Sequence, residues 1–318
     1  MEVERSRMAS VHDPLPPSTA EETADETSPL PQADHLPTFF IIGAMKAGTT
    51  SLYHYLREHP QVFMPPFKAL EFFAGGPQWE RGIDWYRHWF AAAPPEAVAI
   101  GEASNVYTKY PRYRDVPARI AEHIPDARLI YVIRDPIDRI RSHYQTRVAE
   151  GTEKAPLSEA VFSNDIYVAY SRYAMQLEQY LAHFPREQLL VLLAEDLRAE
   201  RASTLRRVYG FLGIDADFTP PNLDREYYKT RDRAARSPIP VWLRKGLKKY
   251  VPATRRAKEL ENNMLAAFRR LGGRAPAPPA PPLILSPATR ERLVEVLADD
   301  VRSMRDILGQ DFHGWGIA

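Results

Sequence analysis

The residues best suited to chemistry lie in a short glycine-rich stretch, GAMKAGTTS at 43–51, between an apolar run and an amphipathic one. A strand that enters a helix through such a loop presents free backbone N–H groups and the positive end of the helix dipole. Further donors come from the side chains of Lys46, Thr49, Thr50 and Ser51. The combination predicts a site for a phosphate-like anion. The alternative is a tight turn in which Thr49 or Thr50 only caps the helix.

The order of residues separates this loop from a Walker-type loop. In G-x-x-x-x-G-K-[ST] the lysine comes directly after the second glycine, and the hydroxyl that holds magnesium follows it. Here Lys46 precedes Gly48, and Thr49 occupies the lysine's place. A nucleotide kinase or other P-loop NTPase stays an alternative, because the later apolar segment LIYVIRD ends in Asp135, which could bind magnesium.

A second candidate anion site lies in RLIYVIRDPIDRIRSHYQ, residues 128–145. An apolar strand ends there at Arg134, and open α/β sheets bind their ligands at the carboxyl ends of strands. Ser142 follows about two helical turns later. An arginine fork with a hydroxyl suits a phosphate monoester. The alternative is that Arg134 pairs with Asp135 at the strand end and that a solvated helix follows.

Both stretches resemble the donor-binding motifs of sulfotransferases that use 3′-phosphoadenosine 5′-phosphosulfate (PAPS). In that family a G-x-x-K-[ASTG]-G-T-[TS] loop cradles the 5′-phosphosulfate, and a strand-end arginine and a helix serine bind the 3′-phosphate. The resemblance implies these donor-binding residues: Lys46, Ala47, Gly48, Thr49, Thr50, Ser51, Arg134 and Ser142.

Other segments are similar to the same family and extend the resemblance over residues 38–315. HPQVFMPPFKALEFF, RGIDWYRHWF and GEASNVYT resemble segments of the branch related to heparan sulfate sulfotransferases. LADDVRSMRDILGQDFHGW resembles the closing helix and tryptophan of bacterial members. The resemblance implies an α/β, P-loop-like three-layer fold with a mostly parallel central sheet flanked by helices.

The resemblance also implies catalytic roles. Lys46 contacts the phosphosulfate and stabilises the leaving group, and no metal is required, because a lysine and backbone amides can stabilise the charge that develops. The usual glutamate base of a K-E-x-H-F-F-like motif is replaced by Ala69 in KALEFF. In an extended backbone Glu71 points to the same side as Ala69 and could act as the base, or it is only a surface or ion-paired carboxylate. Glu102 is a second candidate, and His54 is the nearby imidazole, although a helix position of this kind is more often exposed than catalytic.

A basic stretch, YYKTRDRAARSP at 227–238, occupies the place where related enzymes have a mobile loop that closes over the nucleotide. We expect Arg236, and secondly Arg233, to contact the donor from there, unless the loop is only solvated. A group of aromatic residues follows the glycine-rich loop: Trp79, Trp85, Tyr86 and Trp89. They either line an acceptor pocket or belong to the core, and we favour the core for Trp85 and Trp89.

Apolar strands that alternate with helices predict a parallel sheet covered on both faces. We expect strands at 39–42, 62–64, 99–102, 128–133 and 189–193. We expect later helices at 116–124, 137–150, 167–183, 198–212 and 287–308. Residues 1–37 are rich in proline, serine, threonine and acidic side chains, which predicts a disordered arm before a sulfotransferase domain at 38–318.

Composition narrows the class further. The chain has 318 residues, a formal net charge of +1 and no cysteine. These values give no global attraction to nucleic acid and exclude disulfides, thiol nucleophiles and cysteine-based metal sites. No run approaches the roughly 18 to 20 apolar residues of a membrane helix, so we expect a cytoplasmic protein.

The expected function is in-line transfer of the sulfuryl group from PAPS to a hydroxyl of a carbohydrate, lipid or natural-product acceptor, in a bacterial enzyme. Besides the kinase, a non-catalytic PAPS-binding module is an alternative, because Ala69 removes the usual base. The expected partner is a hydroxyl-bearing acceptor, and no oligomeric state is indicated.

Overall fold

The computed structural model describes residues 35–225, 227, 285–309 and 311–317. In this part of the chain one sheet has the strand order β2-β3-β1-β4-β5, and all neighbouring strands are parallel. The strands are β1 (Phe39–Gly43), β2 (Val62–Phe63), β3 (Ala99–Ala103), β4 (Arg128–Ile133) and β5 (Leu189–Leu193). Each lies within one residue of its predicted bounds. Every residue of the central strand β1 is buried, as expected where helices cover both faces of a parallel sheet.

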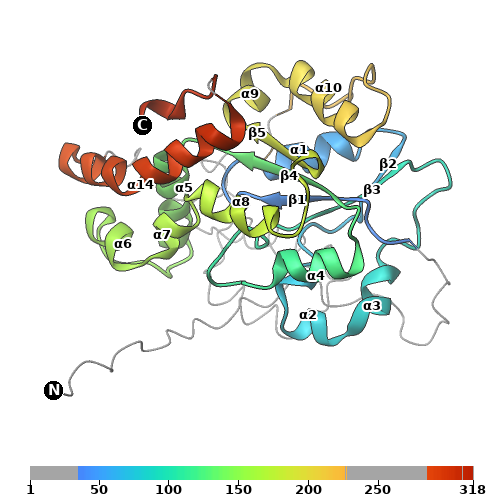
Figure 1. Cartoon of the computed structure of the whole chain (residues 1–318), viewed down its shortest axis with the longest axis horizontal. Coiled ribbons are helices and arrows are strands. Elements are labelled where there is room, and N and C mark those ends of the chain that lie inside the picture. The colour runs from blue at the N-terminus through green and yellow to red at the C-terminus, as the bar shows by residue number, and fades with distance from the viewer. Residues whose placement is uncertain (1–34, 226, 228–284, 310, 318) are drawn as a thin grey trace, which may run out of the picture.

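Helices cover both faces of this sheet. In Figure 1, α1 and α10 lie above the strands, whereas α4 and α8 lie below them. The α-helices are α1 (Thr49–Leu56), α2 (Pro77–Glu80), α3 (Gly82–His88), α4 (Val116–His123), α5 (Pro136–Ala149), α6 (Leu157–Ser163), α7 (Ile166–Ala169), α8 (Tyr173–Leu181), α9 (Ala194–Ala199), α10 (Arg201–Leu212) and α14 (Pro287–Leu308). The 3₁₀ turns are η1 (Phe72–Ala74), η2 (Arg186–Gln188) and η3 (Gly314–Gly316). The predicted three-layer α/β fold is confirmed.

The strand order places a topological switch point at the carboxyl ends of β1 and β4. From β1 the chain crosses to one side of the sheet, toward β2, whereas from β4 it crosses to the other side, toward β5. Open α/β sheets bind ligands at such a switch point, beyond the carboxyl ends of the strands. The amide N of Ala44 donates to the carbonyl O of Val132 at 2.6 Å, so the loop after β1 begins against β4.

Two predicted helices are wrong in extent. The helix expected over 167–183 is divided into α7 and α8, because the guanidinium of Arg139 donates to the Tyr167 carbonyl at 2.7 Å and to the Ser171 hydroxyl at 2.5 Å. The first bond takes the Tyr167 carbonyl, a backbone acceptor that a continuous helix would use, and the second fixes the Ser171 side chain in the break. The helix expected over 198–212 is likewise interrupted at Glu200, where φ is −123° and ψ is 51°.

The C-terminal helix α14 has the predicted bounds and packs along α8. The Asp300 carboxylate accepts hydrogen bonds from the amides of Ala174 and Met175 at 3.1 and 3.0 Å, which ties α14 to the first turn of α8. Residues 1–34 of the predicted arm lie outside the described residues.

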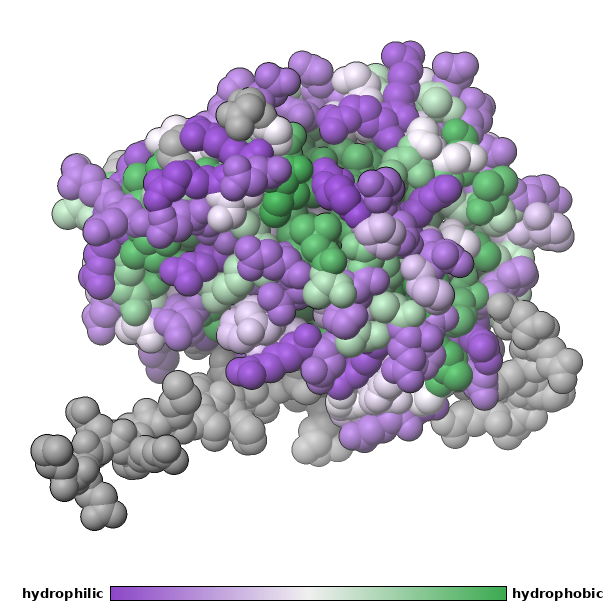
Figure 2. Space-filling model, in the orientation of Figure 1, coloured by the Kyte–Doolittle hydropathy of each residue, from purple (hydrophilic) through white to green (hydrophobic). Residues whose placement is uncertain are grey.

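The surface around this core is mostly polar on the side drawn in Figure 2. Hydrophobic residues on that face form small groups separated by hydrophilic ones. Among the helices that the structure describes, none combines the length and apolar character needed to cross a bilayer.

Candidate active site

The glycine-rich loop turns sharply between β1 and α1. Gly48, the N-cap of α1, has φ of 100°, a conformation that glycine adopts without steric cost, and Lys46 has φ of 73°. No side chain caps α1, so the alternative in which Thr49 or Thr50 serves as the helix cap is wrong. The amides of the first turn and the positive end of the helix dipole therefore face the loop.

Lys68 contacts the start of α1, a position that the sequence did not indicate. Its Nζ atom donates to Oγ1 of Thr49 and to Oγ1 of Thr50, both at 2.9 Å. Burial lowers the pKa of Lys68 to about 7. A lysine in a polar loop is ordinarily assumed to be solvated, and only its position at the start of KALEFF could have drawn attention to it.

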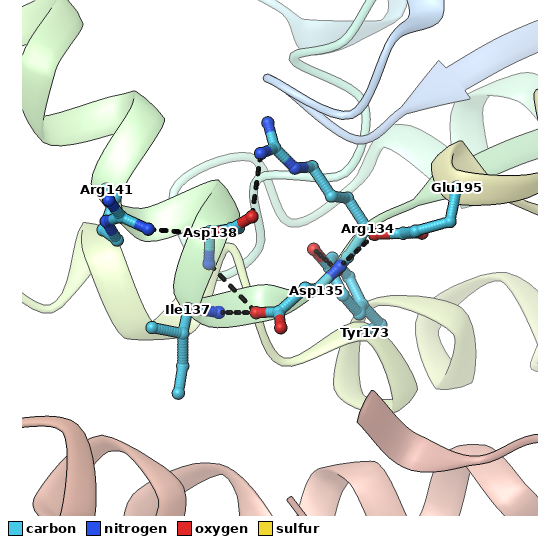
Figure 3. A network of polar contacts seen from close by, with 7 residues as sticks. All are labelled: Arg134, Asp135, Ile137, Asp138, Arg141, Tyr173 and Glu195. Atoms are coloured by element: carbon cyan, nitrogen blue, oxygen red, sulfur yellow. Dashed lines mark hydrogen bonds and ion pairs between the residues drawn. The ribbon is translucent and has the colours of Figure 1, made fainter. Parts of the chain in front are cut away.

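Arg134 lies directly after β4, and its partner is Asp138 rather than the adjacent Asp135. Nη2 of Arg134 lies 3.0 Å from Oδ2 of Asp138, and Nη1 of Arg141 lies 2.8 Å from Oδ1 of the same carboxylate. Figure 3 shows the two arginines reaching Asp138 from different sides. The side chain of Arg134 is 22% exposed, that of Asp138 41% and that of Arg141 32%, so the cluster remains accessible to solvent.

Asp135 has a structural role at the start of α5. Its Oδ1 atom accepts hydrogen bonds from the amides of Ile137 and Asp138 at 2.8 and 3.0 Å, and its own amide donates to Glu195 at 3.0 Å (Figure 3). The kinase alternative requires this carboxylate to bind magnesium. Here the carboxylate satisfies the free amides of a helix N-terminus instead.

The structure brings Ser142 and Lys46 to the same edge as Arg134. Ser142 is buried on α5, four residues after Asp138, so their Cβ atoms lie about 5–6 Å apart on one face of the helix. The next residue, His143, has a pKa held well below its usual value by burial and then by positive charges that include Lys46. The loop after β1 and the helix after β4 are therefore close enough for their charges to interact.

Glu71 follows a backbone that differs from the prediction. Ala69 and Glu71 have φ of 68° and 58°, so the expectation of an extended segment with both side chains on one side is wrong. The amide of Ala69 donates to the Ala103 carbonyl at 2.9 Å, and that of Glu71 donates to the Ser104 hydroxyl at 3.0 Å. These bonds hold the segment against the end of β3. Burial raises the pKa of Glu71, and the charge of Lys109 partly offsets this.

Glu102 lies in the core instead of at the open edge. It is 2% exposed, and its carboxylate accepts hydrogen bonds from the hydroxyls of Tyr86 at 2.5 Å, Tyr107 at 3.0 Å and Ser104. Burial raises the pKa of Glu102 to about 7. An acceptor would have to displace these hydroxyls to reach it.

The four aromatic residues considered for the acceptor pocket differ in how deeply they are buried. Tyr86 is fully buried, whereas Trp79, Trp85 and Trp89 are partly buried and pack against the core. This agrees with the core position favoured for Trp85 and Trp89.

His54 lies beneath the segment that leads to the predicted basic loop. Its ring stacks on Tyr227 with centroids 4.2 Å apart, and the Ser51 hydroxyl donates to the Tyr227 carbonyl at 3.3 Å. The Tyr55 hydroxyl donates to the Arg225 carbonyl at 2.8 Å. Burial, Arg57, Lys68 and Arg225 lower the pKa of His54. The segment is thus anchored on α1, and the predicted donor ligands Arg233 and Arg236 lie outside the described residues.

Comparisons with known proteins agree with this arrangement. Residues 37–219 match the sulfotransferase family. The bifunctional heparan sulfate N-deacetylase/N-sulfotransferase 2 of Mus musculus is 33% identical over 204 residues, which cover 57% of this chain and 22% of that protein. The heparan sulfate glucosamine 3-O-sulfotransferase 3B1 of Mus musculus is 30% identical over 222 residues, 65% of this chain and 54% of the relative.

Each of these matches thus spans less than two thirds of the relative's length. A solved sulfotransferase structure from Alicyclobacillus acidocaldarius has a TM-score of 0.63 and 26% identity, with 89% of this chain and 99% of that chain covered. The chain belongs to the sulfotransferase family.

Proposed function

We propose that this protein transfers the sulfuryl group of PAPS to a hydroxyl of a carbohydrate, lipid or natural-product acceptor. The observation that carries the proposal is that the glycine-rich loop and the Arg134 segment, for which we propose anion binding, meet at one switch point of the sheet. The loop with Lys46 follows β1, and Arg134 follows β4, its neighbour in the sheet. PAPS carries a 5′-phosphosulfate and a 3′-phosphate on the same ribose, so its two anionic groups match two such elements side by side.

The donor would be held by residues from both elements. The loop amides, Lys46 and the hydroxyls that begin α1 face the 5′-phosphosulfate. Arg134 and Ser142 face the 3′-phosphate, where an arginine fork and a hydroxyl supply charge-assisted and neutral hydrogen bonds. Arg236, with Arg233 second, would approach from the segment that follows Tyr227, whose carbonyl contacts Ser51.

The reaction is an in-line displacement at sulfur. The acceptor oxygen forms a bond to sulfur while the bond from sulfur to the bridging oxygen breaks, and the 5′-phosphate leaves with that electron pair. Lys46 stabilises the charge that collects on the bridging oxygen. The acceptor proton passes to a carboxylate, and no metal ion is needed for this balance.

Among the candidate bases, Glu71 fits this role best. It is partly buried at the end of β3, the strand beside β1, and its raised pKa favours proton acceptance. Glu102 is enclosed by three hydroxyl donors, and His54 is covered by Tyr227. We therefore assign proton transfer to Glu71.

The test is transfer of ³⁵S-labelled sulfate from PAPS to a lysate of the source organism, with the labelled product identified by mass spectrometry. The proposal predicts a labelled product with wild-type protein and none with Lys46→Ala. The exposed-lysine variant Lys154→Ala is the matched control and should label the same product. PAPS binding without any labelled product would favour the non-catalytic binding module.

A further inference from the structure

Lys68 is a cationic side chain whose hydrogen-bond partners beside the loop are uncharged. Its side chain is partly buried, and its hydrogen bonds go to two neutral groups, the hydroxyls of Thr49 and Thr50. No carboxylate pairs with it in the part of the chain that the structure describes. Withdrawing an ammonium group from water without a partner is unfavourable, which is why its pKa is lowered to about 7.

The two hydrogen bonds also determine which way the threonine hydroxyls point. An ammonium group has donors only, so each hydroxyl must accept from Lys68 and direct its own hydrogen elsewhere. The hydroxyls of Thr49 and Thr50 begin α1, where the loop amides also point. A neutral amine has a lone pair and can accept from one hydroxyl, which would turn that hydrogen away from the loop.

We propose that Lys68 is a positioning residue of the donor site: its protonated form fixes both threonine hydroxyls as donors to the 5′-phosphosulfate, and donor binding is coupled to its protonation. The inference rests on the proposed function, because it requires an anion in the loop. The anion supplies the missing counter-charge, and this favours the charged form of Lys68.

The neighbouring titratable groups give the direction of the pH effect. His54 on α1 is within electrostatic reach of Lys68, and the charges of Arg57 and Arg225 also act on His54. The pKa of His54 is lowered from 6.5, so this ring is neutral and does not titrate above pH 7. Free Lys68 loses its proton above pH 7, whereas bound Lys68 retains it, so donor affinity should fall as the pH rises.

The first test measures the Kd of adenosine 3′,5′-bisphosphate (PAP) by calorimetry between pH 7 and 8.5. With a pKa of about 7 the protonated fraction of free Lys68 falls from about one half to about 0.03, so PAP should bind about 15-fold more weakly at pH 8.5. The phosphate groups of PAP are nearly fully ionised over this range, since their second pKa is about 6. Lys68→Arg keeps a permanent charge and should bind almost independently of pH, whereas the exposed control Lys154→Arg should behave as wild type.

The second test needs no variant. The apparent binding enthalpy of wild-type protein is compared at pH 7.5 in buffers of different ionisation enthalpy, and the slope gives the protons taken up. Lys68 should contribute about three quarters of a proton per PAP, and Lys68→Met should lose that uptake and bind more weakly.

Proton uptake that persists in Lys68→Met, or a pH dependence shared by wild type and Lys68→Arg, would overturn the role of Lys68 and leave the proposed function intact. Failure of PAP to bind the wild type would overturn both.

Discussion

Replacing Arg134 by alanine tests the assignment of the 3′-phosphate site. The guanidinium lies at the end of β4, 22% exposed, with one ion pair to Asp138 at 3.0 Å. Partly exposed pairs of this kind contribute about 0.2–1 kcal/mol to folding, so Arg134→Ala should remain folded. Asp138 keeps Arg141 as a partner in the variant, at 2.8 Å.

The effect on binding should be much larger than the effect on folding. A hydrogen bond between charged groups contributes about 1.5–3 kcal/mol, and loss of the fork that faces a phosphate should cost about 2–3 kcal/mol. That range corresponds to an increase of about 30- to 150-fold in the Kd for PAP. AMP lacks the 3′-phosphate, so its Kd should change by less than about threefold.

Isothermal titration calorimetry of both nucleotides with wild type and Arg134→Ala gives the comparison directly. The exposed arginine variant Arg206→Ala is the matched control and should leave both Kd values unchanged. Equal losses for PAP and AMP would mean that Arg134 contacts a different part of the nucleotide. An unchanged Kd for PAP would refute the assignment of this strand end to the 3′-phosphate.

Three further variants test the remaining assignments. Glu71→Gln should keep PAP affinity and lower kcat about 10²- to 10⁴-fold in steady-state assays, while the exposed control Glu159→Gln matches wild type. Because burial raises the pKa of Glu71, the wild-type rate should also fall as the pH falls through that raised pKa. Lys46→Ala should weaken PAPS binding and lower kcat together, since both donor and leaving group lose a contact, and a normal kcat at saturating PAPS would contradict this. Glu102 binds its proton more tightly in the folded chain, with a pKa raised from 4.5 to about 7, so wild-type stability from this group is lost as the pH rises through 7. A plot of Tm against pH between pH 5 and 8 should therefore be flatter for Glu102→Gln than for the wild type. Parallel plots would refute the account of its burial.

The sheet and the phosphate-site candidates were predictable because their signals are local. The strands are short and largely apolar runs, and the parallel order places the ends of β1 and β4 side by side. The position of Lys46 before Gly48 is visible in the sequence alone. These features depend on residues close together in the chain.

The features that the sequence did not predict depend on distant contacts. The left-handed backbone at Ala69 and Glu71 accompanies hydrogen bonds to residues more than thirty positions later, Ala103 and Ser104. The break between α7 and α8 occurs where the Arg139 guanidinium binds. No local pattern contains either interaction, because propensity and periodicity describe only neighbouring residues.

Among the candidate site residues, too, the features that the sequence did not predict depend on distant contacts. Lys68 gains its two threonine partners only when β1, α1 and the following segment are folded together. The carboxylate of Glu102 could be placed at a strand end from the sequence, but not its enclosure by hydroxyls from α3 and the turn after β3. Tertiary packing therefore gives the carboxylates of Glu71 and Glu102 different surroundings.

A thermal-shift comparison of PAP with ATP and magnesium tests the proposed function most directly. At 100 times its Kd, PAP should raise the free energy of unfolding by about 2.7 kcal/mol and the melting temperature by about 5 °C. ATP with magnesium should raise it much less, because it lacks the 3′-phosphate that Arg134 and Ser142 are assigned to bind. A larger shift with ATP and magnesium would contradict PAPS as the donor and favour a nucleotide kinase.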